Sequence, residues 1–478
     1  MSNTAQSAAS TRIASLLDAN SFVEIGGQIT ARSTDFNLSA KETPSDGVIT
    51  GYGVIDGSLV YVYSQDATVL NGTVGEMHAK KIARLYDFAM KTGAPVIGLI
   101  DCAGMRLQEA TDALNGFGEI YMQQTKASGV IPQITGIFGT CGGGMAMIPA
   151  LTDFTLMEEK KAKLFVNSPN AIEGNEISKC DTSAAEYQAK EAGLVDFKGS
   201  EEDVLAQIRA LVTMLPANNE DDMSYEECTD DLNRVCKDLA NCAGDTSIAL
   251  SQISDNNVFF EVKAEYAKDM VCGFIKLNGS TVGAVANRTE IYDGEGNLTE
   301  TMDAVLSARG ARKAADFVKF CDAFNIPVLT LTNVTGFKAT KCSEANMAKA
   351  VAELTYAFAD ATVPKVNVIV GKAYGSAYLA MNSKSIGADM VYAWPNAEIG
   401  MMDAKLAAKI MYADSDAATI NEKAAEYATL QSSVESAARR GYVDTIIEAE
   451  DTRKYVIGAF EMLYTKREDR PSKKHGTV

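Results

Sequence analysis

Histidine is nearly absent from this chain, which has only His78 and His475 among its 478 residues. A Ser-His catalytic pair, or a metal site built from several histidines, would have to use one of these two side chains. His78 falls within an expected helix, and His475 is one of the last four residues. The sequence therefore argues against imidazole chemistry and favours an active site that depends largely on backbone groups.

Paired cysteines and long apolar runs are also missing. The nine cysteines include no C-x-x-C pair, which favours reduced, mostly buried thiols over a disulfide framework or a zinc site, so we expect no metal. No apolar run reaches the roughly eighteen residues that a transmembrane helix needs. The first six residues lack the basic and apolar regions of a signal peptide, so we expect a cytoplasmic protein.

Basic residues are outnumbered as well. The chain has 44 Lys and Arg against 63 Asp and Glu, a net charge of −19, and an isoelectric point near 4.7. Such a chain repels the nucleic-acid backbone, so we expect no nucleic-acid partner. Its length is enough for two or more domains. The dense acidic stretch at 218–231 predicts an exposed connection, with domains at 1–225 and 226–478.

What the sequence does contain is two similar glycine-rich turns. Gly139-Thr-Cys-Gly-Gly-Gly-Met-Ala146 follows the apolar run 131–138, and Gly371-Lys-Ala-Tyr-Gly-Ser-Ala-Tyr378 follows the apolar run 363–370. Good helix formers come next, so each stretch predicts a strand, a tight turn and a helix. Glycine lets backbone N–H groups approach a ligand closely, and a helix N-terminus adds positive potential. Such turns suit a phosphate or an oxyanion, for example a thioester enolate.

The two turns belong to a longer internal repeat. In each half an expected hairpin, an amphipathic helix and a buried strand precede the turn; these lie at 47–66, 75–93 and 95–101 in the first half and at 273–287, 308–324 and 327–332 in the second. Seven residue pairs are each 232 positions apart: Lys81 and Lys313, Phe88 and Phe320, Pro95 and Pro327, Gly104 and Gly336, Pro132 and Pro364, Gly139 and Gly371, and Gly143 and Gly375. This period is far too long for a solenoid and predicts a duplicated domain.

Several stretches also carry a family resemblance. They include Asp46-Gly-Val-Ile-Thr-Gly-Tyr-Gly53, Lys126-Ala-Ser-Gly-Val-Ile-Pro-Gln133, Pro149-Ala-Leu-Thr-Asp-Phe154, Lys372-Ala-Tyr-Gly-Ser-Ala-Tyr378 and Ala393-Trp-Pro-Asn-Ala-Glu-Ile399. In these stretches the chain resembles the carboxyltransferase (beta) subunits of biotin-dependent acyl-CoA carboxylases and the related alpha subunits of acyl-CoA decarboxylases. The resemblance covers nearly the whole chain in the order of the family.

The resemblance implies a fold and a set of partners. The fold is α/β, with two tandem crotonase-like (ClpP/crotonase) domains of repeated β-β-α units. The N-terminal domain would mainly hold the coenzyme A thioester, and the C-terminal domain would mainly hold biotin. Implied partners are a biotin carboxyl carrier protein, a biotin carboxylase or a membrane decarboxylase subunit, and further copies of the chain, as a dimer or as a hexamer built as a trimer of dimers.

We expect biotin on the separate carrier protein and not covalently on this chain. The segment Ala89-Met-Lys91 resembles the start of a biotin attachment site, but it lies in an expected helix and lacks the following methionine. Biotin and the coenzyme A thioester would therefore both come to this chain from outside.

The resemblance also assigns roles to the two turns. Carboxyl transfer between biotin and the carbon next to a thioester generates one oxyanion on each partner, and backbone N–H groups can stabilise both. By resemblance, Gly143 and Gly144 would stabilise the thioester enolate. Ser376 and Ala377, in a turn shaped by Gly375, would stabilise the biotin oxyanion.

Four further residues are weaker candidates for substrate binding. Gly104 and Gly336 lie on the loops after the preceding strands and would form the facing walls. Arg106 is either a ligand of a coenzyme A phosphate or a surface arginine at a helix start. Leu379 stands where propionyl-specific members often have aspartate, so it indicates a different acyl pocket.

The implied activity is carboxyl transfer between carrier-bound biotin and a short-chain acyl-CoA. Our first expectation is a carboxylase of the acetyl-CoA or propionyl-CoA type, the commonest role in the family. The alternative is the alpha subunit of a sodium-pumping decarboxylase acting on methylmalonyl-CoA or glutaconyl-CoA. Two further hypotheses belong to other functional classes. One is a biotin-independent crotonase-type hydratase or thioesterase, and the other is a silent scaffold subunit of a carboxylase complex.

Overall fold

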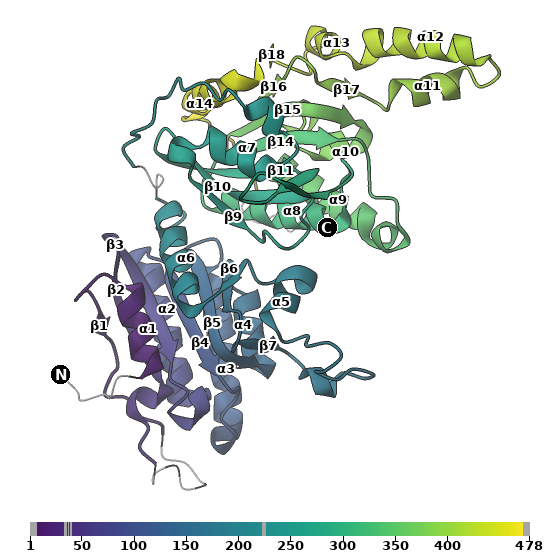
Figure 1. Cartoon of the computed structure of the whole chain (residues 1–478). Helices are drawn as coiled ribbons and strands as arrows, with labels where there is room; N and C mark the ends of the chain where they lie inside the picture. The colour runs from purple at the N-terminus through teal and green to yellow at the C-terminus, as the bar shows by residue number, and fades with distance from the viewer. Residues whose placement is uncertain (1–6, 33–35, 37, 39–40, 222–225, 472–478) are drawn as a thin grey trace. The chain divides into compact units, whose positions relative to one another are not determined.

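The chain folds into two compact units, residues 1–224 and 225–478 (Figure 1). The computed structural model describes residues 7–32, 36, 38, 41–221 and 226–471, so His475 lies outside the described residues. Each unit is built on one eight-stranded sheet. Within these described ranges no helix is long and apolar enough to cross a membrane.

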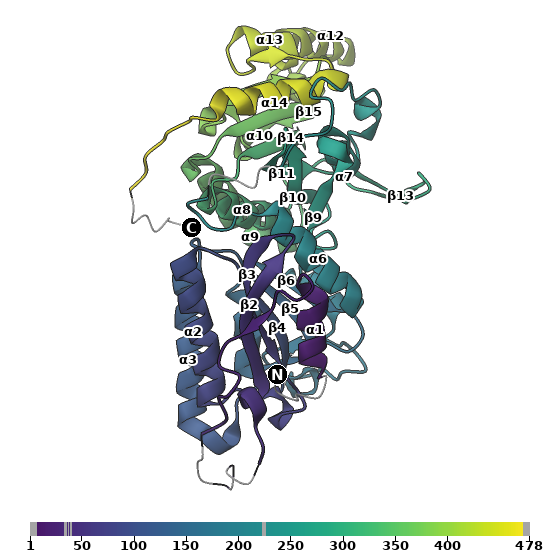
Figure 2. The same cartoon turned by 90° about the vertical axis from the view of Figure 1, so that its left-hand side faces the viewer.

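The sheet of the first unit combines an antiparallel hairpin with parallel strands. β2 and β3 form the hairpin, and β3, β4, β5 and β6 then lie side by side in parallel. Figure 2 shows α2 and α3 on one face of this sheet and α1 and α6 on the other. The strands are β1 (Val23–Glu24), β2 (Val48–Ile55), β3 (Ser58–Gln65), β4 (Val96–Cys102), β5 (Gln133–Gly142), β6 (Phe154–Glu158), β7 (Lys163–Phe165) and β8 (Phe197–Gly199). The helices are α1 (Ala8–Leu16), α2 (Glu76–Thr92), α3 (Ala110–Ala127), α4 (Met147–Ala150), α5 (Ala185–Tyr187) and α6 (Glu201–Met214).

Hydrophobic patterning accounts for these elements. In α2 the residues Ile82, Leu85 and Ala89 recur at helical spacing and are buried against the sheet. Gly93 ends the helix in the left-handed conformation, with φ of +66°. The strand β4 is apolar and buried from Val96 to Ile100, as expected of a parallel strand covered on both faces.

The second unit repeats the same spatial order. Its hairpin is β10 and β11, and the parallel strands β14, β15 and β16 follow beside β11. The strands are β9 (Phe259–Val262), β10 (Met270–Leu277), β11 (Ser280–Asn287), β12 (Glu290–Tyr292), β13 (Leu298–Thr301), β14 (Val328–Val334), β15 (Lys365–Tyr374), β16 (Met390–Ala393), β17 (Glu398–Gly400) and β18 (Thr445–Ile446). The helices are α7 (Thr246–Ile253), α8 (Ala308–Ala323), α9 (Lys341–Asp360), α10 (Gly375–Ala380), α11 (Ala404–Met411), α12 (Ala417–Tyr427), α13 (Val434–Arg439) and α14 (Thr452–Leu463).

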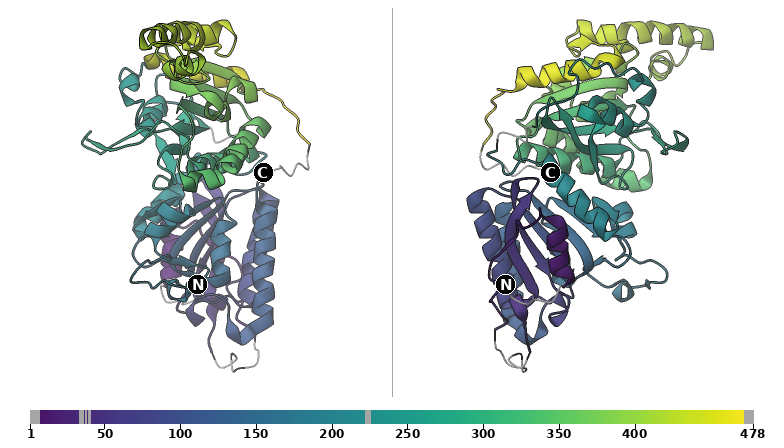
Figure 3. Two further views of the ribbon diagram at one scale, coloured as in Figure 1. Left: turned by 90° about the vertical axis from the view of Figure 1, so that its right-hand side faces the viewer. Right: turned by 60° about the vertical axis from the view of Figure 1, so that its left-hand side comes forward.

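Two features distinguish the second unit from the first. The helices α11 and α12 form an arm that projects from its sheet, as Figures 1 and 3 show. The short strands β12 and β13 form a separate two-stranded sheet after the main hairpin. Each feature adds surface to the second unit without changing the strand order of its main sheet.

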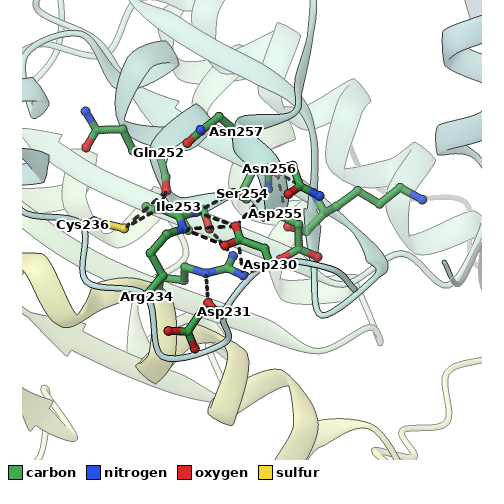
Figure 4. A network of polar contacts seen from close by, with 12 residues as sticks. Asp230, Asp231, Arg234, Cys236, Gln252, Ile253, Ser254, Asp255, Asn256 and Asn257 are labelled. Carbon is green, nitrogen blue, oxygen red and sulfur yellow. Dashed lines mark hydrogen bonds and ion pairs between the residues drawn. The ribbon is translucent and has the colours of Figure 1, made fainter. Parts of the chain in front are cut away.

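Two arginines, Arg234 and Arg453, fasten the start of the second unit to its core (Figure 4 labels Arg234 and its partners). Arg234 pairs with Asp230 at 2.9 Å and donates to the carbonyl of Ser254 at 2.9 Å. The fully buried Arg453, on α14, pairs with Asp255 at 2.7 Å. Burial opposes ionisation of Asp230, but its hydrogen bond with Arg234 and neighbouring charges lower its pKa to about 2. The segment from residue 226 onward is therefore an integral part of the second unit.

Candidate functional site

The first glycine turn leaves bare backbone at the end of a central strand. β5 ends at Gly142, and a 3-10 turn over Gly143–Ala146 leads into the single turn of α4. Gly143 has φ of +61°, in the left-handed region that favours glycine. Gly144 is exposed, whereas the two residues after it are buried. The peptide groups of Gly143 and Gly144 are thus not covered by side chains of their own.

The second turn has the same shape and the same pattern of exposure. α10 begins at Gly375, which also has φ of +61°. Ser376 is exposed, Ala377 and Tyr378 are buried, and Leu379 is 43% exposed. Both expected helices are short, α4 with four residues and α10 with six. The helix dipole is correspondingly small, so the N–H groups themselves are the main source of positive potential at each turn.

Glycine is required at the start of each turn because a polar side chain occupies the adjacent space. A Cβ atom at Gly139 would overlap the carboxylate of Asp101, and one at Gly371 would lie 2.6 Å from Oδ1 of Asn333. That Asn333 oxygen accepts the N–H of Lys372 at 3.0 Å. The two glycines, which occupy equivalent positions of the internal repeat, are therefore explained by the same close approach in both units.

The loops after β4 and β14 also match. The carbonyl of Gly104 accepts the N–H of Val74 at 2.9 Å, and the carbonyl of Gly336 accepts the N–H of Leu306 at 2.9 Å. Gly104 has φ of +112°, and a Cβ there would lie 3.6 Å from the carbonyl oxygen of Gly142. In the first unit the Gly104 loop therefore lies directly beside the glycine turn, where a facing wall is expected.

A cavity of about 750 Å³ opens beside the second turn. Its lining includes Asn333, Gly371, Lys372 and Glu398. Lys372 is exposed, and its Nζ lies 5.9 Å from the ring centroid of Tyr374, whose hydroxyl is hydrogen-bonded to Glu398. Burial and the Glu398 carboxylate raise the pKa of Tyr374, so the phenol stays protonated. The cavity thus offers a cation and polar groups beside Gly371, at the start of the second turn.

Comparison with known proteins identifies the family to which this chain belongs. A family model described as the carboxyl transferase domain matches residues 3–478. The chain belongs to the carboxyl transferase family. The family predicted from the sequence is therefore confirmed.

Relatives in the carboxyl transferase family match almost end to end. The chain is 41% identical to the methylmalonyl-CoA decarboxylase subunit alpha of Veillonella parvula and 40% identical to the propionyl-CoA carboxylase beta chain of Roseobacter denitrificans. Each match covers 98% of this chain and 92% of the relative. A crystal structure of transcarboxylase 12S, described as a hexamer assembly with hydrolysed methylmalonyl-coenzyme A bound, matches with a TM-score of 0.92 and 37% identity. That match covers 99% of this chain and 92% of the other.

These matches confirm two of the sequence predictions. The fold consists of two crotonase-like units, as in the transcarboxylase structure. The chain is an acyl-CoA carboxyltransferase, the component that carboxylases and decarboxylases of this family share. Among the described residues no group of three or more His, Cys, Asp or Glu is arranged to hold a metal ion.

The placement of Arg106 corrects the expectation that it reaches a coenzyme A phosphate or lies on the surface. Its side chain is fully buried and pairs with Asp46 at 2.6 Å and Glu109 at 2.7 Å. The guanidinium also donates to the carbonyl of Thr73 at 2.8 Å. Three internal acceptors therefore hold Arg106 in the core of this carboxyltransferase, where it ties the loop after β4 to the segment before β2.

His78 is also a buried structural residue. Its Nδ1 lies 3.0 Å from the carbonyl of Asp46, and its Nε2 lies 3.2 Å from Nε2 of Gln65. Burial, with the nearby charge of Arg106, lowers the pKa of His78 well below its ordinary value, so the imidazole is neutral. These hydrogen bonds account for the histidine at this position of α2 without any role in catalytic proton transfer.

Sequence reasoning missed three polar side chains behind the turns. Tyr121 on α3 donates its hydroxyl to the carbonyl of Gly144 at 2.6 Å. Gln65 and Asn287, at the ends of β3 and β11, contact the loops of their own units. The signal in the sequence was weak, because the partners of each residue lie tens of positions away along the chain.

Proposed function

We propose that this carboxyltransferase works with biotin delivered on a separate carrier protein and acts on a short-chain acyl-CoA of the propionyl-CoA and methylmalonyl-CoA type. The observation that carries the proposal is the pair of matching turns, one in each unit, each with bare backbone at a left-handed glycine. Two substrates that each develop an oxyanion need two such sites. The names of the relatives support the acyl group.

The roles of the residues follow from the turns. Gly143 and Gly144 would donate N–H groups to the thioester oxygen, with Gly104 on the facing wall. This arrangement stabilises negative charge where it develops, and the rigid backbone needs no reorganisation when the charge forms. The first unit would therefore take the coenzyme A thioester.

The second turn fits the oxyanion of a biotin ureido group. Gly375 allows the turn, exposed Ser376 and its neighbour Ala377 would supply N–H donors, and Gly336 would form the facing wall. The chemistry that biotin supplies when bound is a ureido nitrogen that carries the carboxyl group and can take up the α-proton. A neutral, buried His78 agrees with an enzyme in which proton transfer does not require histidine.

Leu379 is proposed to influence the choice of acyl group. It is 43% exposed and follows the second turn by four residues, counted from Gly375. An apolar side chain at this place favours an acyl group other than that of relatives with aspartate there, in opposition to the names of the relatives, and the comparison of substrates below decides between the two. Replacing Leu379 with Asp should therefore change the ratio of kcat/KM values between acyl-CoA substrates.

We further propose that the working enzyme is an oligomer in the cytoplasm, with a biotin carrier protein and either a biotin carboxylase or a membrane decarboxylase subunit as partners. The hexamer described for transcarboxylase 12S supports a hexamer of this chain. The exposed apolar face of α11, where Leu406 is 50% and Ile410 is 62% exposed, supports burial of this arm by another copy.

The experiment that tests the acyl group measures CO2 release by the purified oligomer at fixed free biotin. Malonyl-, methylmalonyl- and glutaconyl-CoA are compared by kcat/KM. The proposal predicts that methylmalonyl-CoA has the highest value. A preference for glutaconyl-CoA or malonyl-CoA would overturn the proposed acyl group. Hydration or thioester hydrolysis that needs no biotin would favour a crotonase-type enzyme instead.

The direction of the reaction is tested by partners that copurify from the native cell. A biotin carboxylase would indicate carboxylation, which the family's commonest role favours. A membrane subunit would indicate decarboxylation, which the 41% identity to a decarboxylase alpha subunit supports. Binding of a carrier protein without turnover of any coenzyme A ester would indicate a scaffold subunit.

A further inference from the structure

In the first unit one buried amide joins the two loops of the proposed thioester site. Gln65, at the end of β3, is fully buried. Its Oε1 accepts the N–H of Asp101 at 3.2 Å, one residue before β4 ends and the Gly104 loop begins. Its Nε2 lies 3.9 Å from Sδ of Met145, the residue directly after Gly144. A single side chain thus contacts both sides of the site.

The orientation of this amide is set by the neutral His78. Nδ1 of His78 faces the carbonyl of Asp46 and must therefore carry the proton, which leaves Nε2 as an acceptor. Nε2 of Gln65 then donates to Nε2 of His78 at 3.2 Å, and its second N–H faces the sulfur of Met145. With its nitrogen fixed in this way, the oxygen of Gln65 must face Asp101.

The second unit has a similar buried amide, Asn287, but no histidine beside it among the described residues. Asn287, at the end of β11, accepts the N–H of Asn333 at 3.0 Å through Oδ1. Its Nδ2 lies 3.8 Å from Sδ of Met381, directly after α10. Asn333 corresponds to Asp101 in the internal repeat, and it lies one residue before the end of β14, which leads into the loop that contains Gly336. Both units thus have a backbone N–H donor, an amide acceptor and a methionine sulfur beside the amide nitrogen, but the sulfur lies within the turn at Met145 and after α10 at Met381.

The strand ladders explain why an amide is needed at this place. The pairing of β4 with β5 shifts between Ile100 and Cys102, and the pairing of β14 with β15 shifts between Thr332 and Val334. Asp101 and Asn333 are therefore skipped by the ladder, and their N–H groups are taken up by the amide side chains. A backbone amide that lost its acceptor at this place would leave its N–H without its partner and loosen the end of the strand.

We propose that Gln65 and Asn287 are positioning residues, each of which holds the two loops of one oxyanion site in register. The inference rests on the proposed function for its catalytic consequence, because neither side chain is placed to touch a substrate. Gln65 ties the end of β4 to the glycine turn, and Asn287 ties the end of β14 to Met381 behind the second turn. Each amide thereby keeps the N–H donors of its unit aimed at one point. Misaligned donors would stabilise the transition state less while still binding the ground state.

The structural test is amide hydrogen exchange in Gln65→Met, which keeps the length and apolar bulk of the side chain. We expect exchange to rise about tenfold in peptides covering 101–105 and 140–146, and to stay unchanged in 333–337 and 375–381. Asn287→Leu should show the reverse pattern. Gln133→Met is the matched control, because Gln133 is also fully buried but lies at the opposite end of β5 and donates to the carbonyl of Gln124 at 3.1 Å.

This test separates the inference from the proposed function, because it needs no turnover. Exchange that rises throughout the mutated unit, that stays unchanged in the loops, or that is matched by Gln133→Met would overturn the positioning role. Where CO2 release is measurable, Gln65→Met should lower kcat about tenfold while KM for the acyl-CoA stays within about threefold. An unchanged kcat in Gln65→Met, with the loops loosened, would equally overturn the catalytic part.

Discussion

At the scale of single residues, corresponding aspartates of the two units differ in their surroundings. Asp153 accepts the N–H of Gln133 at 2.8 Å, and Asp389 accepts the N–H of Lys365 at 2.8 Å. Asp389 also pairs with Lys466 at 2.9 Å. Burial raises the pKa of Asp153 to about 7, and the nearby Asp196 adds to the effect. In the first unit, the carboxyl group of Asp153 therefore keeps a proton up to about neutral pH.

We predict that Asp153→Asn becomes more stable relative to the wild type as the pH rises. Between the ordinary aspartate pKa of about 4 and the folded value of about 7, folded Asp153 keeps a proton that the unfolded chain has lost, so this group lowers wild-type stability by about 1.4 kcal/mol per pH unit. Asparagine keeps the acceptor for Gln133 without a charge. The melting temperatures of both proteins from pH 5 to 8 check this. The difference should grow up to about pH 7 and then level off, and a constant difference would contradict it.

A second residue-scale prediction concerns Tyr121. Its hydroxyl holds the carbonyl of Gly144, one of the two proposed thioester donors, at 2.6 Å. Tyr121→Phe should lower kcat roughly three- to tenfold, in keeping with the loss of about 1 kcal/mol from one hydrogen bond, with little change in melting temperature. Tyr464→Phe, at a position 67% exposed, is the control. Equal kcat values for the wild type and Tyr121→Phe would contradict this role.

Single-residue roles were the part of the site that the sequence could not settle. The glycines of both turns were recognisable from spacing alone, because a strand followed by small residues has few structural solutions. Arg106 was misplaced because its acceptors come from residues 46, 73 and 109, which converge only in the fold. Gln65 was missed because its partners, Asp101 and Met145, are likewise distant in sequence.

At the scale of elements, each unit fixes the segment before its hairpin with a buried lysine. Lys313 on α8 donates to the carbonyls of Lys263, Tyr266 and Met270 at 2.8, 2.9 and 2.7 Å. Lys81 on α2 does the same through the carbonyls of Ser45 and Val48 and the hydroxyl of Ser45. Burial lowers the pKa of both ammonium groups, that of Lys81 to about 8. In both halves of the internal repeat, a buried lysine on the helix therefore holds the segment that leads into the hairpin.

We predict that Lys313→Met is strongly destabilising. The substitution preserves most of the side-chain volume but leaves three carbonyls, one buried and two partly buried, without their donor, at a cost of about 2–4 kcal/mol. Lys319→Met, at an exposed position of the same helix, should change stability by less than about 0.5 kcal/mol. Urea unfolding followed by circular dichroism gives both values. Similar midpoints for the two variants would show that the clamp contributes nothing.

The repeated elements were largely predictable and the added ones were not. The hairpins, α2, α8 and the buried strands have strong periodicity and clear Gly or Pro limits, and the structure confirms them. A helix follows each glycine turn as expected, with four residues in α4 and six in α10. The arm α11–α12 and the strands β12–β13 went unpredicted, because the duplication that guided the assignment of elements gave no pattern for them.

At the scale of the whole molecule, the α11–α12 arm is the surface that most needs a partner. Met401, Leu406, Ile410 and Met411 on and before α11 are 50–72% exposed. Single exposed apolar residues are ordinary, but several on one short helix indicate an interface. With the hexamer described for transcarboxylase 12S, this supports the proposed assembly.

We predict that native mass measurement at micromolar concentration gives six times the chain mass of 51.0 kDa. Ile410→Asp places a charge in the proposed interface and should shift the population toward smaller species, with the fold of each chain retained by circular dichroism. A wild-type protein with the mass of a single chain under these conditions would contradict the assembly. A hexamer unaffected by Ile410→Asp would place the interface elsewhere.

The most direct test of the central claim is CO2 release from methylmalonyl-CoA by the purified wild-type oligomer, measured with and without free biotin. If the two turns serve biotin and an acyl-CoA, release should rise with biotin concentration and saturate, and propionyl-CoA should form in equal amount. Release that is independent of biotin, or no release from a folded oligomer, would contradict the account of a biotin-dependent carboxyltransferase acting on this acyl group.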